Sequence, residues 1–230
     1  MQVISTNVGS AEDNPGPRYP RTGINKQPVD VLHLAIPGPH YGDGSGVQGD
    51  FVGDNEHHGG ADRAVYAYSR EELDYWSARL GSTLANGSFG DNLTTRGIDL
   101  KQLVINQRVR IGSAVLEVSV PRTPCATFAA WMGEKGWLKS WSERADCGCY
   151  FRIIEPGDIR PGDAIELGPA PDHGVTMTEA FRAKMGDLDV AHKVVTAQCL
   201  PAHHHNAVLK RIEVAEKHAA ISAARSTTRS

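Results

Sequence analysis

Cys125 is the residue whose neighbours point most directly to chemistry. It ends the stretch 121–125, in which two prolines and Arg122 form a stiff, positively charged turn after a β-prone run at 115–120. Positive surroundings favour the thiolate, which is the form that attacks electrophiles and binds soft metals. The other interpretation is a buried cysteine that acts as a small hydrophobic residue. The local residues alone do not separate the two.

His58 begins a second segment with chemical potential, His-Gly-Gly-Ala-Asp-Arg at 58–63. The two glycines predict a tight turn whose backbone can approach something closely. His58 would project from this turn, with Asp62 near enough to set the tautomer of its imidazole ring. A purely structural histidine is the alternative. We expect His57 to face the other way, which makes it a weaker candidate.

The elements that must position these residues are mainly short strands. Gly and Pro recur through the first 60 residues and separate short apolar runs. Frequent turns between short β-prone segments predict an all-β barrel or sandwich. Further strand patterns follow at 102–105, 108–111, 114–120, 150–154 and 163–167.

Helical patterns are fewer. A capping-box sequence at 69–72 predicts one surface helix that ends at Gly81, and helical spacing returns from 128 to 141. Three short amphipathic helices are expected between 176 and 212. We therefore expect a mainly β domain at 1–170, a small three-helix domain at 171–215 and a disordered tail at 216–230.

Composition excludes some broad classes of function. The net charge of −3 argues against a general nucleic-acid or anionic-membrane binder, which would carry a basic excess. No stretch approaches the roughly 20 apolar residues that cross a bilayer, and the N-terminus lacks a secretion signal, so a cytoplasmic location is expected. The four cysteines are spread unevenly, which favours reduced thiols over a disulfide framework.

Four motifs in a fixed order resemble one known family. They are TGINKQPV, a GD pair followed by HGGADRAV, GDNLTT and PRTPC, and they span residues 22–125. Together they resemble the MOSC domain family, and more closely its YiiM-like branch. The resemblance runs from about residue 20 to residue 168. It implies a MOSC-type β-barrel with a few peripheral helices, and the three later helices match the small helical domain that follows this barrel.

The resemblance also implies a cofactor. MOSC enzymes use a cysteine beside the two sulfurs of molybdopterin, so Cys125 would be the protein ligand of molybdenum. The phosphate and the pterin of this cofactor need cations and hydrogen-bonding partners. His58 and Asp62 would act beside Cys125 in catalysis. The cofactor-binding residues that it implies are Lys26, Arg63, Asn92, Thr94 and Arg122.

Each of these cations, taken alone, could equally be a solvated surface charge, and Asn92 could serve only its own turn. Three functions stay open. The first is a molybdenum-dependent reductase of N-hydroxylated compounds, such as hydroxylaminopurines or amidoximes. Its electrons would come from a separate reductase, because the chain carries no flavin, iron–sulfur or nicotinamide fingerprint. The others are a sulfur carrier with a persulfide on Cys125 and a non-catalytic molybdopterin-binding protein. A homodimer is also left open.

Cys147 and Cys149 depart from the family pattern. A lone Cys-x-Cys pair is too sparse for a zinc site, and the histidines at 203–205 would have to complete one. The two thiols are either incidental or able to resolve an oxidised or persulfidated Cys125.

Overall fold

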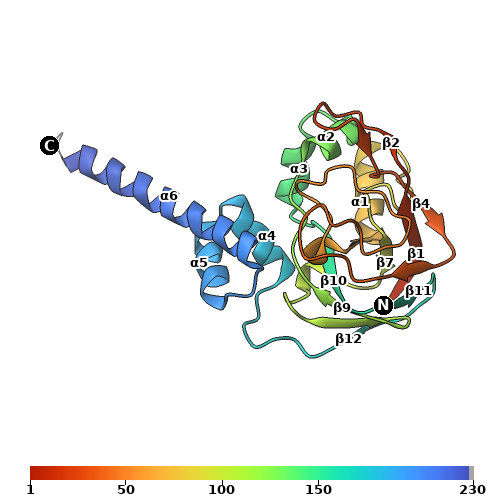
Figure 1. Cartoon of the computed structure of the whole chain (residues 1–230). Coiled ribbons are helices and arrows are strands. Elements are labelled where there is room, and N and C mark those ends of the chain that lie inside the picture. The colour runs from red at the N-terminus through yellow and green to blue at the C-terminus, as the bar shows by residue number, and fades with distance from the viewer. Residues whose placement is uncertain (228–230) are drawn as a thin grey trace.

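A curled eight-stranded mixed sheet forms the body of the protein (Figure 1). The computed structural model describes the backbone of residues 1–227 and the side chains of residues 1–221. Neighbouring strands are antiparallel except β6 and β7, which are parallel. In spatial order the strands are β12 (Ile165–Leu167), β8 (Arg108–Ile111), β9 (Ala114–Val118), β10 (Cys149–Glu155), β6 (Val65–Ser69), β7 (Leu93–Arg96), β1 (Gln2–Gly9) and β4 (Lys26–Val29).

The sheet curls until its two ends meet. The Val3 amide donates to the Asp163 carbonyl over 3.0 Å, and the Gly162 amide donates to the Val3 carbonyl over 2.8 Å. The first half of β1 therefore pairs with the segment before β12, while its second half pairs with β4. The predicted MOSC-type barrel is confirmed. Two small sheets lie beside it, one of β5 (Leu32–Leu34) with β11 (Gly157–Ile159) and one of β2 (Glu12–Asp13) with β3 (Arg21–Thr22).

The parallel pair needs a crossover connection, and helix α1 (Arg70–Leu80) supplies it. The Ser69 hydroxyl accepts from the Glu72 amide over 3.2 Å at the start of the helix. Gly81, with φ of 67°, ends it in the left-handed conformation that glycine adopts at low cost. The helix predicted at this place is confirmed at both ends.

Two short helices follow Cys125, as the spacing of the aromatic residues predicts. They are α2 (Ala126–Met132) and α3 (Trp137–Arg144). Phe128 of α2 packs edge-on against Trp137 and Trp141 of α3, with ring centroids 5.4 Å apart in both pairs. This aromatic cluster fixes α2, and with it the backbone of Cys125, against the barrel.

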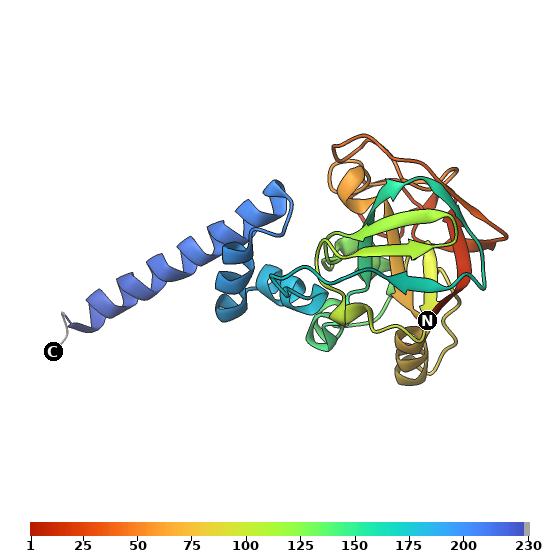
Figure 2. The same ribbon diagram turned by 90° about the horizontal axis from the view of Figure 1, so that it is seen from below.

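Three helices complete the described chain and lie together on one side of the barrel (Figures 1 and 2). They are α4 (Met177–Met185), α5 (Leu188–Ala197) and α6 (Ala202–Thr227). Thr176 and Glu179 form the expected capping box. Phe181 of α4 packs against Trp141 with ring centroids 5.8 Å apart, and the Met177 amide donates to the Leu103 carbonyl over 2.8 Å. The helices thus share a core with the barrel.

Helix α6 is longer than we expected. Its 26 residues continue to Thr227, so residues 216–227 are helical and do not form the disordered tail that we expected. This stretch contains no Gly or Pro and is rich in alanine, which has the highest helix propensity. Residues 228–230 lie outside the described part of the chain. No helix within residues 1–227 combines the length and apolarity that a membrane span requires.

Candidate functional site

One cleft of the barrel brings together six of the eight residues predicted for the site. We call it the Cys125 cleft. Asp62 and Thr94 do not line it. The predicted residues that do are Lys26, His58, Arg63, Asn92, Arg122 and Cys125.

Cys125 occupies the N-cap position of α2 and is partly exposed. Its carbonyl accepts from the Ala129 amide over 3.1 Å, which fixes the backbone at the start of the helix. The side chain makes no capping hydrogen bond, so the sulfur is free to contact something else. The unpaired amides at the helix start and the nearby Arg122 give this position a positive electrostatic potential. A thiol in such a position suits an electrophilic or metal partner.

Arg122 is a buried cation that keeps part of its hydrogen-bonding capacity unused. Its Nη1 donates to the Phe89 carbonyl. The guanidinium carbon lies 4.1 Å from the ring centroid of Phe128 and 5.1 Å from that of Tyr66. Its Nε is buried and has no hydrogen-bond partner among the described residues. A buried donor without a partner is costly, so an anionic group in the cleft would stabilise Arg122.

Lys26 and Asn92 are held by a residue that the sequence did not single out as a site residue, Asp50. The Asp50 carboxylate pairs with Lys26 Nζ and accepts from Asn92 Nδ2 over 3.0 Å. It also accepts from the Gly9 amide and from the Ser45 hydroxyl, at 2.7 Å and 3.0 Å. Lys26 is therefore already neutralised by a buried partner, which leaves it less able to bind an added anion than Arg122.

We assign His58 as a neutral imidazole with its proton on Nε2. Burial, reinforced by the nearby Arg63, lowers the pKa of His58 to about 3. Nδ1 lies 3.5 Å from Arg63 Nη1, a donor, so we assign Nδ1 as the acceptor and Nε2 as the protonated nitrogen. Nε2 lies 3.9 Å from Asp54 Oδ2, too far for a direct hydrogen bond. This N–H can donate to a ligand in the cleft.

The expectation that Asp62 orients His58 is wrong. Asp62 Oδ1 accepts from Arg152 Nε over 2.6 Å, and the carboxylate near His58 belongs to Asp54. Asp62 lies in the 3₁₀ turn η1 (Ala61–Arg63), which packs against β10 where Arg152 projects. Sequence proximity pointed to Asp62, whereas the fold pairs it with a residue 90 positions away.

Thr94 also lies away from the cleft. Its hydroxyl donates to Asp91 Oδ2 over 2.6 Å and accepts from Asn7 Nδ2 over 3.1 Å, and all three residues are buried. Burial raises the pKa of Asp91. Thr94 therefore satisfies a buried carboxyl inside the barrel wall and does not face a ligand.

The glycines after His58 allow this turn to approach another loop of the chain closely. Gly59 and Gly60 have φ of 79° and 73°, and a Cβ on Gly60 would lie 2.1 Å from the His40 carbonyl oxygen. The Gly60 amide donates to the Gly44 carbonyl over 2.8 Å. The turn thus packs against the loop at 40–44, and this contact places His58 at the edge of the cleft.

Two tyrosines line the cleft without having been predicted. Tyr66 and Tyr150 lie on adjacent strands with ring centroids 4.7 Å apart. The Tyr66 hydroxyl donates to the Cys147 carbonyl over 2.9 Å, but the Tyr150 hydroxyl has no partner among the described residues. Burial raises the pKa of Tyr150, so its hydroxyl stays protonated. The alternation of β10 points this residue into the cleft, a direction that residue type alone does not reveal.

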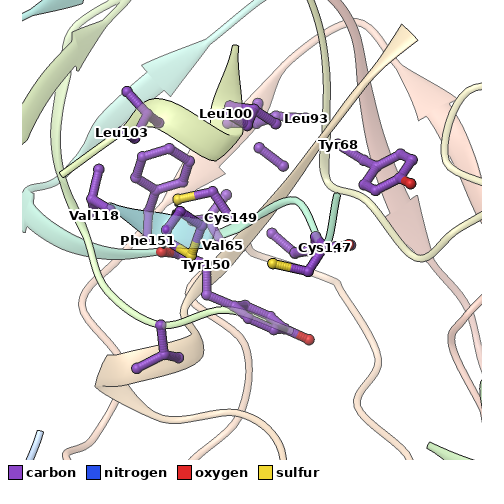
Figure 3. Packing of buried hydrophobic residues seen from close by; sticks show 14 of the residues in the cluster. Val65, Tyr68, Leu93, Leu100, Leu103, Val118, Cys147, Cys149, Tyr150 and Phe151 are labelled. Atoms are coloured by element: carbon purple, nitrogen blue, oxygen red, sulfur yellow. Dashed lines mark hydrogen bonds between the residues drawn. The ribbon is translucent and has the colours of Figure 1, made fainter. Parts of the chain in front are cut away.

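Cys147 and Cys149 belong to the core. Figure 3 shows both thiols among packed side chains, with Cys149 beside Phe151 and Val118. Burial raises the pKa of each thiol well above its usual value. Neither residue lines the Cys125 cleft, and within the described residues no three His, Cys, Asp or Glu side chains form a metal-binding group. The idea that the histidines at 203–205 complete a zinc site is therefore not supported.

The donor set of the cleft fits the molybdenum cofactor. An accessible sulfur on Cys125 is a suitable metal ligand. The unpartnered Nε of Arg122 and the N–H of His58 are donors that phosphate or pterin oxygens would satisfy. The fit rests on these three groups, since Lys26 and Asn92 already have protein partners.

Comparison with known proteins identifies relatives along most of the chain. The model of the MOSC domain matches residues 54–166. "Uncharacterized protein YflK" of Bacillus subtilis is 33% identical over 187 residues, which cover 80% of this chain and 81% of that protein. "Protein YiiM" of Escherichia coli is 28% identical over 125 residues, 53% of this chain and 56% of that one. A protein of Gibberella moniliformis named "Reductase" is 31% identical over 142 residues, 58% of this chain and 24% of the much longer relative.

A solved structure shares the fold. The crystal structure of YiiM from Geobacillus stearothermophilus superposes with a TM-score of 0.71 at 23% identity, covering 92% of this chain and 98% of that one. The likeness extends beyond the residues that the domain model matches, so it includes helices of the C-terminal part.

Proposed function

The chain belongs to the MOSC family, in its YiiM-like branch, and from this we propose that it is an oxidoreductase that binds the molybdenum cofactor through Cys125 and reduces N-hydroxylated compounds. Hydroxylaminopurines and amidoximes are the substrate types. The observation that carries the proposal is a free, partly exposed cysteine at a helix N-cap, facing a cleft that also holds an arginine with an unsatisfied donor. The fungal relative named as a reductase supports the reaction class.

The residues of the cleft divide the work. Cys125 would hold the metal, while Arg122 would bind phosphate or pterin oxygens. When bound, the cofactor supplies the two-electron redox chemistry that removes an oxygen atom from nitrogen. The overall reaction consumes two electrons and two protons and converts the N-hydroxyl compound into the amine or amidine and water. A separate reductase supplies the electrons.

The chain itself contributes proton donors. The hydroxyl oxygen released by cleavage of the N–O bond already carries one proton, so one of the two added protons completes water and the other goes to the nitrogen. His58 Nε2–H and the Tyr150 hydroxyl are neutral donors at the cleft that have no hydrogen-bond acceptor among the described residues. Each can donate a hydrogen bond to the departing oxygen, which stabilises the negative charge that develops there.

Metal analysis of the wild type and of Cys125→Ser tests the proposal. Both proteins would be produced in a host that makes the cofactor, and molybdenum, oxidised-pterin fluorescence and reduction of a hydroxylaminopurine by a chemical electron donor would be measured. We expect near-equimolar molybdenum in the wild type and in the control Cys199→Ser, and loss of metal and turnover in Cys125→Ser. Absence of both molybdenum and pterin from the wild type would contradict the proposal.

A sulfur carrier is the second candidate. One observation favours it: Cys125 is the only one of the four cysteines that is not buried, and it lies beside cations that would stabilise a persulfide anion. Mass spectrometry of the intact protein after incubation with a sulfur donor distinguishes the two functions, because a carrier gains one sulfur on Cys125 without needing molybdenum. A protein that retains the cofactor but reduces no N-hydroxylated compound would point to the third function, a non-catalytic molybdopterin-binding protein.

A further inference from the structure

A second cavity lies where the barrel meets helices α4 and α6. We call it the Lys184 cavity. Half of its lining residues are Lys, Arg or His, and none is Asp or Glu. These six residues are His57, Arg63, Lys184, His203, His204 and Arg211.

The lysine and the two arginines of this cavity have no counter-ion among the described residues. No ion pair joins Arg63, Lys184 or Arg211 to a carboxylate within the described chain, and of the residues that line the cavity only His57 lies beside one, Asp54 at 3.1 Å. The Nε of Arg63 is buried and lacks a hydrogen-bond partner. Placing three like charges around one cavity is unfavourable unless an anion enters it.

Lys184 makes one side-chain hydrogen bond among the described residues, and its partner is the imidazole of His204. Its Nζ lies 2.6 Å from His204 Nδ1, and His204 Nε2 lies 2.7 Å from the Tyr41 hydroxyl. Burial, with the nearby Lys184, lowers the pKa of His204, so the ring is neutral. A protonated Lys184 donates to Nδ1, the Nε2 proton then goes to the Tyr41 oxygen, and the Tyr41 O–H stays free to donate. The cavity thus offers a hydroxyl donor besides its three cations.

The Lys184 cavity adjoins the Cys125 cleft, and one residue lines both. Arg63 lines both. Thr123 and Pro124 line the Lys184 cavity, and Cys125, the next residue, lines the cleft. The two sites are therefore neighbours on either side of Arg63 and the 123–125 segment.

We propose that the Lys184 cavity binds a phosphate-type oxyanion, and that this oxyanion belongs to the molecule reduced in the Cys125 cleft. A dianion fits three uncompensated cations better than a carboxylate does, and arginine binds phosphate in a bidentate manner. The second part rests on the proposed function and narrows its substrate class to N-hydroxylated phosphate esters, such as nucleotides, in preference to free bases.

Titration with inorganic phosphate tests the site without any turnover. The variant is Arg211→Gln, because Arg211 is exposed on a helix and its loss leaves the core intact. The matched control is Arg79→Gln, an exposed helical arginine that lines neither cavity. By calorimetry we expect saturable binding to the wild type and the control, and a dissociation constant about tenfold higher for Arg211→Gln, as loss of one charge-assisted contact predicts. No saturable binding to the wild type, or equal weakening in both variants, would overturn the proposal.

Kinetics of the cofactor-loaded enzyme shows which molecule carries the oxyanion that binds in the Lys184 cavity. We would compare kcat/KM for a phosphate-bearing N-hydroxylated purine with that for its uncharged counterpart. Arg211→Gln should lower the ratio of these values about tenfold, and Arg79→Gln should leave it unchanged. An unchanged ratio in Arg211→Gln would overturn the assignment to the substrate and leave free phosphate as the ligand. Loss of molybdenum and pterin from Arg211→Gln would overturn it in favour of the cofactor's own phosphate. If the wild type reduces neither compound, the proposed function fails, while the titration still decides whether the cavity binds phosphate.

Discussion

The Asn92 side chain donates from Nδ2 to Asp50 Oδ2 over 3.0 Å and joins two loops that are 42 residues apart in sequence. The same carboxylate neutralises Lys26, so the polar side of the Cys125 cleft is one buried hydrogen-bonded network. Lys26 and Asn92, which were expected to bind the cofactor, thus bind a carboxylate of the protein itself. Arg122 and Arg63 are left as the cations of the cleft that can take an added anion.

Asp50→Asn should destabilise the fold. It removes the charge that compensates Lys26, whose side chain is only 7% exposed, and loss of one partner of a buried ion pair costs about 3 to 5 kcal/mol. Urea unfolding would measure this. The control Asp13→Asn breaks the exposed pair with Arg21 and should change the free energy of unfolding by less than about 1 kcal/mol. Similar small losses in both variants would show that Lys26 is not held as described.

Asp62→Asn should leave the cofactor in place. Since Asp62 pairs with Arg152 outside the cleft, we expect normal molybdenum and pterin content and a stability loss of roughly 1 kcal/mol. Arg122→Gln, in contrast, should lower the cofactor content, because it removes the buried guanidinium of the cleft. The measurement is metal and pterin content beside urea unfolding. Loss of molybdenum from Asp62→Asn would show that Asp62 does contribute to cofactor binding.

The four thiols should differ in reactivity. Cys125 is partly exposed, whereas the other three are buried, and burial raises the pKa of Cys147, Cys149 and Cys199. Brief iodoacetamide treatment of the cofactor-free protein, followed by peptide mass spectrometry, should find the label on Cys125 alone. Urea should expose the rest. Early labelling of Cys147 would mean that it is available to resolve an oxidised Cys125.

The local features of the fold could be predicted from sequence. The helix between Ser69 and Gly81 and the capping box at Thr176 depend on residues a few positions apart, and both are found as expected. The four motifs also predicted most of the site residues that line the cleft, because they contain Cys125 and its cationic neighbours.

Contacts between distant segments could not be predicted in the same way. The partner of Asp62 is 90 residues away, and the pairing of β10 with β6 is what brings Tyr150 beside Tyr66. The Lys184 cavity exists only because α4 and α6 dock on the barrel. Such contacts depend on strand order and helix docking, which no local pattern records. The length of α6 was missed for another reason, since its polar, alanine-rich sequence is typical of both helix and disorder.

Lys184→Met should stabilise the cofactor-free protein in a pH-dependent way. Burial and the neighbouring Arg63 lower the pKa of Lys184 to about 7 from its ordinary 10.5. Between pH 7 and 10.5 the unfolded state therefore binds more protons at Lys184 than the folded state does. The free energy of unfolding of the wild type accordingly rises with pH across that window. The other groups facing Lys184 are His204 and Arg211 of α6 and Cys147 before β10.

The stability gain of Lys184→Met should accordingly be largest below pH 7 and shrink as the pH rises toward 10.5. Urea unfolding in phosphate-free buffer measures it, with the exposed Lys135→Met as a control whose difference from the wild type stays flat. A gain that grows with pH would mean that Lys184 is compensated by a negative group.

Phe181→Ala should destabilise the barrel and the helices together. Phe181 is 1% exposed and packs on Trp141, and truncating a buried Phe costs about 3 to 5 kcal/mol. Leu209→Ala, on the exposed face of α6, should cost less than about 1 kcal/mol. Tryptophan fluorescence and far-UV circular dichroism should report one transition. Separate transitions would show that α4 to α6 unfold as an independent unit.

The closure of the sheet has a consequence for how the chain is made. Gln2 and Val3 find their edge partners only at 162–165, so the first strand leaves the ribosome long before that edge can be covered. At about 5 to 20 residues per second, the interval is roughly 8 to 30 s. Throughout it the nascent chain carries an open strand edge beside apolar side chains, a hazard for edge-to-edge aggregation. Yield in a heterologous host should therefore depend on chaperone supply and growth temperature more strongly than the stability of the finished protein suggests.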